Sequence, residues 1–204
     1  QFADPNRIDR IREELSGYDS YAQHYSAYNK RRSWSAFALR GFRPDDPGFI
    51  IKPAEMAKSW KDANPDSESR TCGNTTIANK FPATWELIRR IPCATLERVR
   101  FMRLAESNGE LSRHADITDR AAGPGLGHVA RLHIPIYTNP EVWFLSWNER
   151  GKLERCRLKT GSLWYLDTRK PHAVTNTGNT TRVHLVVDVV CNESTQKMLL
   201  SGGR

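Results

Sequence analysis

The chain has 204 residues and carries 31 lysine and arginine residues against 23 aspartate and glutamate residues, a formal net charge of +8 at pH 7. A chain of this length can bury a complete core, so we expect a single domain over residues 1–204. With 38% hydrophobic and 26% charged residues, the composition is that of a soluble globular protein. No apolar run approaches the roughly 20 residues that span a bilayer, which argues against a membrane protein.

The excess of basic residues favours an anionic partner, either nucleic acid or a small dicarboxylate. The densest basic run, at residues 30–32, holds only three such residues. A solvated basic surface is therefore favoured over nucleic-acid binding.

The cysteines lie far apart and form no CxxC pair: Cys72, Cys93, Cys156 and Cys191. This spacing is typical of neither a zinc knuckle nor a secreted disulfide framework. No signal peptide is visible at the start of the sequence, so we expect a reducing, cytoplasmic location.

The first 94 residues predict helices and loops with one strand. Asp4 followed by Pro5 is a typical helix start, and Gly17 ends the amphipathic stretch that follows. Prolines also open the next two helices, and Pro92 stops the second of them. The predicted elements are helices over residues 5–16, 53–64 and 82–91 and a strand over residues 34–39.

From residue 95 onward, short β-rich runs alternate with turn signals. Strands are predicted over residues 96–104, 110–114, 128–137, 142–147, 152–158, 162–166, 173–176 and 182–190. This spacing favours a sandwich or small barrel over a parallel βαβ sheet. A helix is expected over residues 193–200, and loops that cover a site over residues 67–74 and 121–127. The sequence thus predicts a mainly β fold, with a helical flank and the first strands over 1–94 and a β core over 95–192.

Two histidines and one carboxylate have a pattern that suits a metal ion. His114 and Asp116 are two positions apart at the end of a predicted strand, so both side chains leave the same face. His172 precedes a later strand, and two histidines with one carboxylate form the facial triad of non-haem Fe(II). A lone HxD also occurs by chance in surface segments, so this hypothesis depends on the residues that accompany it.

Arg182 follows His172 across a turn, and a hairpin there would return it beside that histidine. Arg182 shares one strand face with His184, and Arg131 shares one face of an earlier strand with His133. Aliphatic residues occupy the opposite faces of both strands. Charged and titratable groups are costly to bury unless they bind something, so these faces predict a pocket.

The order of these motifs resembles the aspartyl/asparaginyl β-hydroxylase family, whose bacterial relatives include amino-acid hydroxylases such as proline cis-hydroxylases. The motifs are HxD at 114–116, RLHIPI at 131–136, GSLWYLD at 161–167, PHAVTN at 171–176 and RVHL at 182–185. The resemblance covers about residues 95–190. It implies a double-stranded β-helix, the cupin-like jelly roll, with iron and 2-oxoglutarate at one mouth.

The resemblance also implies a role for each matching residue. His114 and His172 would be iron ligands, and Asp116 would complete the triad. Animal members of the family lack this carboxylate, so the chain is similar to the bacterial small-molecule hydroxylases. Arg182 would bind the distal carboxylate of 2-oxoglutarate.

Two further residues have weaker implied roles. His133 would lie near the other end of the co-substrate, and Arg131 near the substrate. A hydrogen-bonded core histidine and a structural ion pair, respectively, are the alternatives for these two side chains.

Residues and resemblance together predict an Fe(II)- and 2-oxoglutarate-dependent dioxygenase that uses O₂ to hydroxylate an aliphatic carbon of an amino-acid substrate. Succinate and CO₂ would be released, with ascorbate as an activator in vitro. A free amino acid is the preferred substrate, and an Asp or Asn residue of a peptide or protein is the alternative. Two other classes stay open. A cupin-type metalloenzyme without 2-oxoglutarate leaves Arg182 unexplained, and a non-catalytic β-sandwich module would bind carbohydrate or nucleic acid.

Overall fold

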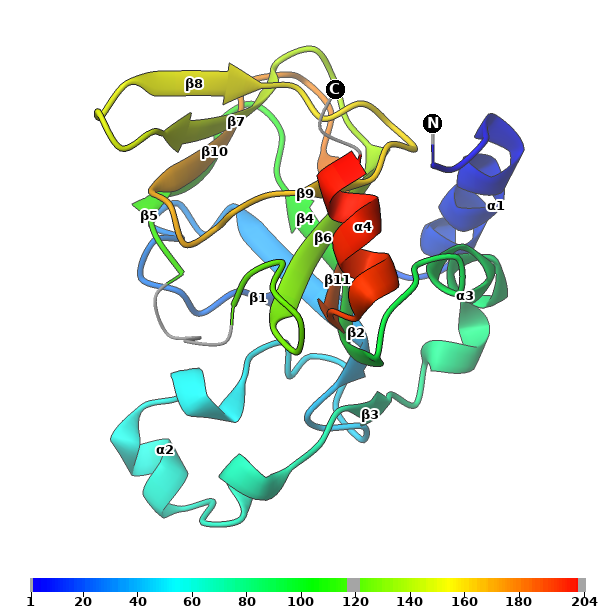
Figure 1. The fold of residues 1–204 in the computed structure, drawn as a ribbon, viewed down its shortest axis with the longest axis vertical. Coiled ribbons are helices and arrows are strands. Elements are labelled where there is room, and N and C mark those ends of the chain that lie inside the picture. Colours follow the sequence, from blue (N-terminus) through cyan, green and yellow to red (C-terminus); the bar gives the residue numbers. More distant parts are fainter. Residues whose placement is uncertain (1, 117–121, 202–204) are drawn as a thin grey trace.

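Two antiparallel sheets form the framework of the computed structural model, which describes residues 2–116 and 122–201 (Figure 1). The larger sheet has the strand order β1-β2-β4-β11-β6-β9, with β3 paired to β2, and the smaller sheet has the order β5-β10-β7-β8. The jelly roll and the mainly β fold with flanking helices are confirmed. Residue 121, the start of one predicted loop, lies outside the described residues. Within the described ranges, no helix has the length and apolar character needed to cross a membrane.

The strands are β1 (Ala22–Gln23), β2 (Trp34–Gly41), β3 (Gly73–Asn74), β4 (Thr95–Leu104), β5 (Gly109–His114), β6 (Val129–Tyr137), β7 (Val142–Trp147), β8 (Leu153–Cys156), β9 (Trp164–Tyr165), β10 (His172–Asn176) and β11 (Arg182–Val190). The helices are α1 (Pro5–Ser16), α2 (Lys58–Asp62), α3 (Pro82–Ile88) and α4 (Glu193–Ser201), with 3-10 turns η1 (Pro53–Glu55), η2 (Ser67–Ser69) and η3 (Ala78–Lys80).

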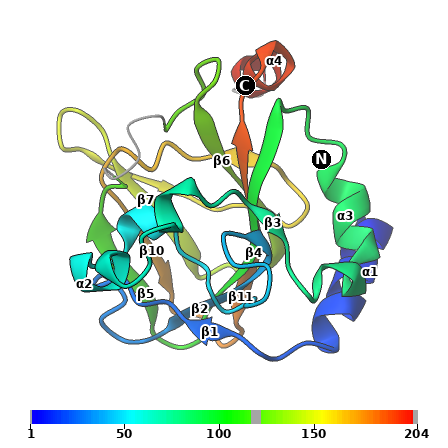
Figure 2. The same ribbon diagram turned by 90° about the horizontal axis from the view of Figure 1, so that it is seen from below.

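The central strands of the larger sheet, β4, β11 and β6, have one apolar and one polar face, because side chains alternate along a strand. The apolar face includes Phe101, Leu132 and Leu185, all fully buried, and belongs to the same core as residues of α1 and α3. Figures 1 and 2 show these two helices side by side along one flank of the sheet. The polar face is turned away from the helices, and its buried polar members are Arg98, Arg100, His133, Arg182, His184 and Asp188.

Helix α1 begins and ends as the sequence predicts. The Asp4 carboxylate accepts a hydrogen bond from the backbone N–H of Arg7 at 3.0 Å, Pro5 occupies the first turn, and Gly17 follows the last turn. Capping of this kind satisfies backbone donors that the helix itself leaves unpaired. Ile8, Ile11 and Leu15 line the buried face.

The helix predicted over residues 53–64 is wrong as a single element. The structure has η1 and α2 instead, separated by Met56 and Ala57 in extended conformations with ψ of 153° and 151°. Met56 packs against a buried cluster that includes Ile50 and Ile51, so tertiary packing overrides the local helical preference. The helix predicted over residues 82–91 also ends earlier, at Ile88.

The predicted hairpin between His172 and Arg182 is also wrong. Strand β10 pairs with β5 and β7 in the smaller sheet, whereas β11 pairs with β4 and β6 in the larger one. The turn between them therefore crosses from one sheet to the other. The Asn176 side chain fastens this crossing by donating to the carbonyls of Ala105 and Thr180 and accepting from the Gly178 N–H.

We expect Glu14→Ala to lower the free energy of unfolding by about 1–2 kcal/mol, in the range of a lost helix cap. The Glu14 carboxylate, from α1, accepts hydrogen bonds from the backbone N–H groups of Ala83 and Thr84 at the start of α3. No side chain at the N-cap position of α3 does this. Urea unfolding measures the effect, and Glu13→Ala, an exposed neighbour, is the matched control. Equal unfolding midpoints for the two variants would contradict the capping role.

Candidate active site

Two histidines and an aspartate meet at one end of the smaller sheet. His114 ends β5, His172 begins β10, and their Cα atoms are direct partners across the two strands. Asp116 follows two residues after His114, and its Oδ1 lies 3.7 Å from His114 Nε2. One ligand atom from each of the three side chains lies within 4.8 Å of the others. The cluster has the composition and the spacing of a metal site.

Both histidines are held so that the same ring nitrogen faces the cluster. His114 Nδ1 lies 2.8 Å from the carbonyl oxygen of Ser112, and His172 Nδ1 lies 3.0 Å from that of Lys170. A carbonyl oxygen only accepts, so the proton resides on Nδ1 and leaves the Nε2 lone pair free for a metal. Burial lowers the pKa of His172, with the His114 ring adding to the effect, which favours the neutral form that metals bind.

Aromatic rings support the two histidines from outside the cluster. Tyr28 stacks on His114 with ring centroids 4.7 Å apart, and Phe144 stacks on His172 at 5.7 Å. Tyr28 belongs to the segment between β1 and β2, so the amino-terminal flank contributes to the site. The orientation of both imidazoles is therefore restricted by packing as well as by hydrogen bonds.

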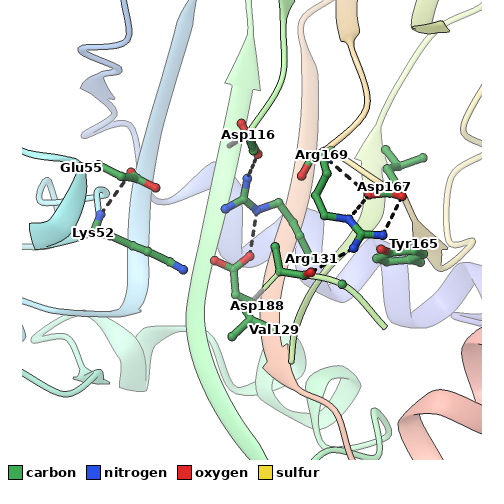
Figure 3. A pocket seen from close by; sticks show the side chains of 13 residues that line it. Lys52, Glu55, Asp116, Val129, Arg131, Tyr165, Asp167, Arg169 and Asp188 are labelled. Carbon is green, nitrogen blue, oxygen red and sulfur yellow. Dashed lines mark hydrogen bonds and ion pairs between the residues drawn. The ribbon is translucent and has the colours of Figure 1, made fainter. Parts of the chain in front are cut away.

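Asp116 is fixed by an arginine rather than by solvent. Arg131 on β6 donates through Nη1 to Asp116 Oδ2 and through Nε to Asp188 Oδ1 at 2.9 Å (Figure 3). Burial raises the pKa of Asp116, but the Arg131 guanidinium and both histidines outweigh it and hold the pKa below its ordinary value. The structural ion pair that the sequence left open for Arg131 is thus present.

Arg182 is buried without a compensating charge. Its side chain is 6% exposed, its Nε has no hydrogen-bond partner, and no ion pair joins it to a carboxylate of the described chain. Burial lowers its pKa to about 9. An isolated guanidinium in a protein interior is costly, so this position is suited to an anion.

His133 and His184 lie beside this arginine with both ring nitrogens of each unpartnered. Their rings meet edge to face at 5.8 Å. Burial, and next the Arg182 charge, lower the pKa of both well below 6.5, so both are neutral and each keeps one N–H donor.

All six residues singled out from the sequence line one cavity, with an empty volume of about 560 Å³. His114, Asp116 and His172 are on its wall together with Arg131, His133 and Arg182. The remaining lining is mostly apolar: Trp34, Met102, Leu104, Leu111, Phe144, Thr168 and Val174. The wrongly predicted hairpin does not affect this result, because the two sheets bring Arg182 and His172 to the cavity from opposite sides.

Three residues of the polar interior were missed from the sequence. Asp188 is 1% exposed and forms ion pairs with Arg98, Arg100 and Arg131. The sequence did contain a pattern that indicates a polar strand face here. Arg98 and Arg100 alternate with Val99 and Phe101, as Arg131 alternates with its aliphatic neighbours.

A jelly roll that holds two histidines and a carboxylate beside a cavity has the donor set that non-haem Fe(II) sites use. The family model described as "Aspartyl/Asparaginyl beta-hydroxylase" matches residues 6–191, and the chain belongs to this family. The name of the family describes hydroxylases. No curated protein matches the sequence.

Two solved structures share the fold at low sequence identity. One is an oxidoreductase of the 2OG-Fe(II) oxygenase family from Burkholderia pseudomallei, with 11% identity, a TM-score of 0.51, and coverage of 92% of this chain and 79% of that one. The other is a prolyl hydroxylase from Trichoplax adhaerens, in complex with a peptide fragment of the hypoxia inducible factor oxygen degradation domain. It has 12% identity, a TM-score of 0.51, and coverage of 95% and 82%.

We expect Asp188→Asn to lower the free energy of unfolding by about 3–5 kcal/mol, because it leaves the buried guanidinium groups of Arg98 and Arg100 without their carboxylate. Burial raises the pKa of Asp188, but Arg100, Arg131 and Arg98 hold it well below the ordinary 3.8. The stabilisation is therefore complete above pH 3.8 and is lost as the pH falls from there toward the folded-state pKa.

Unfolding followed between pH 3 and 7 checks this expectation, with Asp45→Asn, an exposed aspartate, as control. A stability of Asp188→Asn equal to that of the control would refute the structural role of the cluster.

Proposed function

We propose that the chain is an Fe(II)- and 2-oxoglutarate-dependent dioxygenase that hydroxylates an aliphatic carbon of an amino-acid substrate. The observation that carries the proposal is Arg182, a buried arginine in the same cavity as the His114, Asp116 and His172 cluster that has no counter-ion among the described residues. A co-substrate with a carboxylate at one end and metal-binding oxygens at the other fits both features at once.

The donor set fits iron. Two neutral imidazole nitrogens and one carboxylate suit Fe(II), and three ligands on one face leave positions open for other molecules. When bound there, iron together with 2-oxoglutarate and O₂ supplies the oxidising chemistry that converts C–H to C–OH, with release of succinate and CO₂. Asp116 keeps its charge because Arg131 lowers its pKa, and His172 stays neutral because burial lowers its own.

The protein's part is to bind, orient and exclude water. The planar guanidinium of Arg182 would donate two parallel hydrogen bonds to the distal carboxylate of 2-oxoglutarate. His133, whose ring nitrogens have no partner among the described residues, would complete the polar end of the cavity, with the His184 ring packed against it. Leu104, Leu111 and further apolar side chains line the space between, which keeps water from the reacting atoms.

The two alternative functions do not account for all the residues of the cavity. A cupin-type metalloenzyme without 2-oxoglutarate leaves Arg182 buried and uncompensated. A non-catalytic binding module leaves His114, Asp116 and His172 without a role, although two ring nitrogens and a carboxylate oxygen of these side chains lie within 4.8 Å of one another.

Succinate release from 2-oxoglutarate tests the proposed class. Purified protein with Fe(II), ascorbate and O₂ is assayed across free amino acids and peptides that contain Asp or Asn. Metal-dependent succinate that increases with one substrate supports the proposal. Absence of both turnover and calorimetric 2-oxoglutarate binding would reject it in favour of the binding module.

Replacing a metal ligand should reduce metal affinity without unfolding the protein. We expect His172→Ala to weaken Co(II) binding by about 100-fold or more, since even residues that only orient a ligand contribute 10–100-fold. Titration followed by visible absorption measures this. His128→Ala removes an exposed histidine outside the cluster and should leave the affinity unchanged. Equal affinities in both variants would exclude His172 as a ligand.

Replacing Arg182 should weaken 2-oxoglutarate binding without lowering the free energy of unfolding. Arg182→Met should weaken 2-oxoglutarate binding by about 100-fold, in the range reported for losing one partner of a buried charge pair. The free energy of unfolding should not decrease, because the arginine has no counter-ion in the part of the chain that the structure describes. Calorimetry with Mn(II) in place of iron and urea unfolding give the two values. Arg103→Met, on the same sheet but partly exposed, is the control. An unchanged affinity in Arg182→Met would restore the cupin alternative.

A further inference from the structure

A second, more open cleft reaches the metal-ligand cluster from another direction. It has an empty volume of about 990 Å³ and shares His114, Asp116 and Arg131 with the first cavity, but not Arg182. Its lining also includes Arg98 and Arg100. A molecule in this cleft would lie next to the metal while 2-oxoglutarate occupies the Arg182 side, so the cleft is the place for a substrate.

Three arginines line this cleft, and among the described residues two carboxylates form ion pairs with them. Asp188 Oδ2 accepts from Arg98 Nε at 2.9 Å and from Arg100 Nη2 at 2.8 Å, and its Oδ1 accepts from Arg131. The second carboxylate in contact with the group is Asp116, bound by Arg131. A bound metal ion would take up the charge of Asp116, and Asp188 would then be the carboxylate in direct contact with all three guanidinium groups.

Arg98 and Arg100 also have unused hydrogen-bond donors. Arg98 Nη2 lies 2.9 Å from Asp188 Oδ2 but forms no hydrogen bond of acceptable geometry, and Arg100 Nε has no partner. The Nη1 atoms of both reach only the carbonyl of Ile50, at 3.5 Å. Burial, with the neighbouring Arg98 charge, lowers the pKa of Arg100 to about 9. Both side chains are at most 2% exposed, so these donors are buried at the wall of the cleft.

The rest of the cleft lining includes one further carboxylate and several aromatic side chains. Glu55 of η1 lines the same cleft, and its carboxylate accepts a hydrogen bond from the backbone N–H of Lys52 at 3.4 Å (Figure 3). Among the described residues, Glu55 forms no ion pair with an arginine. Tyr25 and Tyr28 form the exposed side of the cleft, and Trp34 lies behind them, stacked on His24 at 3.6 Å.

We propose that the substrate is a free amino acid whose carboxylate binds Arg98 and Arg100 and whose ammonium group faces Glu55. The cationic wall and the single carboxylate match the two charges of a zwitterion, and the aromatic side accommodates its carbon skeleton. An internal residue of a peptide has neither a free α-carboxylate nor a free ammonium group. The inference rests on the proposed function, because it places the amino acid beside the metal of that same site.

Thermal unfolding with three small probes tests this assignment. The protein is loaded with Mn(II) and saturating 2-oxoglutarate, so that the Arg182 site is occupied, and then receives propionate, propionamide or L-alanine at matched ionic strength. We expect propionate to raise the unfolding midpoint by about 2–4 °C, as for a moderately occupied site in a chain of this size. Propionamide should have no effect, and L-alanine should exceed propionate.

Substitutions test which side chains bind the carboxylate and the ammonium group of the probes. Arg100→Lys should abolish the propionate shift, since an ammonium group cannot replace the planar fork, while 2-oxoglutarate affinity stays within about twofold. Glu55→Gln, on an accessible turn, should keep the propionate shift and remove the advantage of L-alanine. Arg103→Lys is the matched control and should behave as wild type.

The outcomes separate the two proposals. Equal shifts from propionate and propionamide, or a propionate shift that survives in Arg100→Lys, would overturn the assignment of the carboxylate. L-Alanine no better than propionate in the wild type would overturn the role of Glu55. If 2-oxoglutarate itself fails to bind with Mn(II), the proposed function fails, whereas a propionate shift that depends on Arg100 would still support an anion site.

Discussion

A single buried carboxylate, Asp188, connects the three central strands of the larger sheet, which form one side of the site. It lies on β11 and binds arginines from β4 on one side and from β6 on the other. Because one of these arginines, Arg131, also holds Asp116, the same interaction that joins the three central strands orients a predicted metal ligand. Buried ionic networks are sensitive to the loss of one member, so the geometry of the site and the integrity of the larger sheet are linked here.

The fold follows from strand alternation to a large extent. Strands β7 and β11 have the predicted bounds, and β4 and β6 differ from prediction by one residue at one end. The opposite polarity of the two faces of β6 and β11 was visible in the residues themselves, so the side chains that reach the cavity were predictable. The assignment of their roles depended on the resemblance to the family as well as on the spacing.

Other features of the fold could not be predicted from the local sequence. A turn at residues 177–179 has the same chemistry whether it closes a hairpin or passes between sheets, and only the partners of β10 and β11 determine which occurs. The break at Met56 depends on packing against residues near Ile50. Asp188 stands in an otherwise aliphatic run, where its importance is evident only once Arg98 and Arg100 are placed beside it.

The position of the two histidines in the smaller sheet has a mechanical consequence. Strand β5 is the edge of this sheet and is joined to it only through β10, and His114 and His172 face each other across that one pairing. An ion bound to both would act as a cross-link at the open end of the strand pair, in addition to the backbone hydrogen bonds. Because such an ion binds only the folded arrangement, it would stabilise the edge of the sheet, and its loss would allow β5 to fray from the end nearest the cavity.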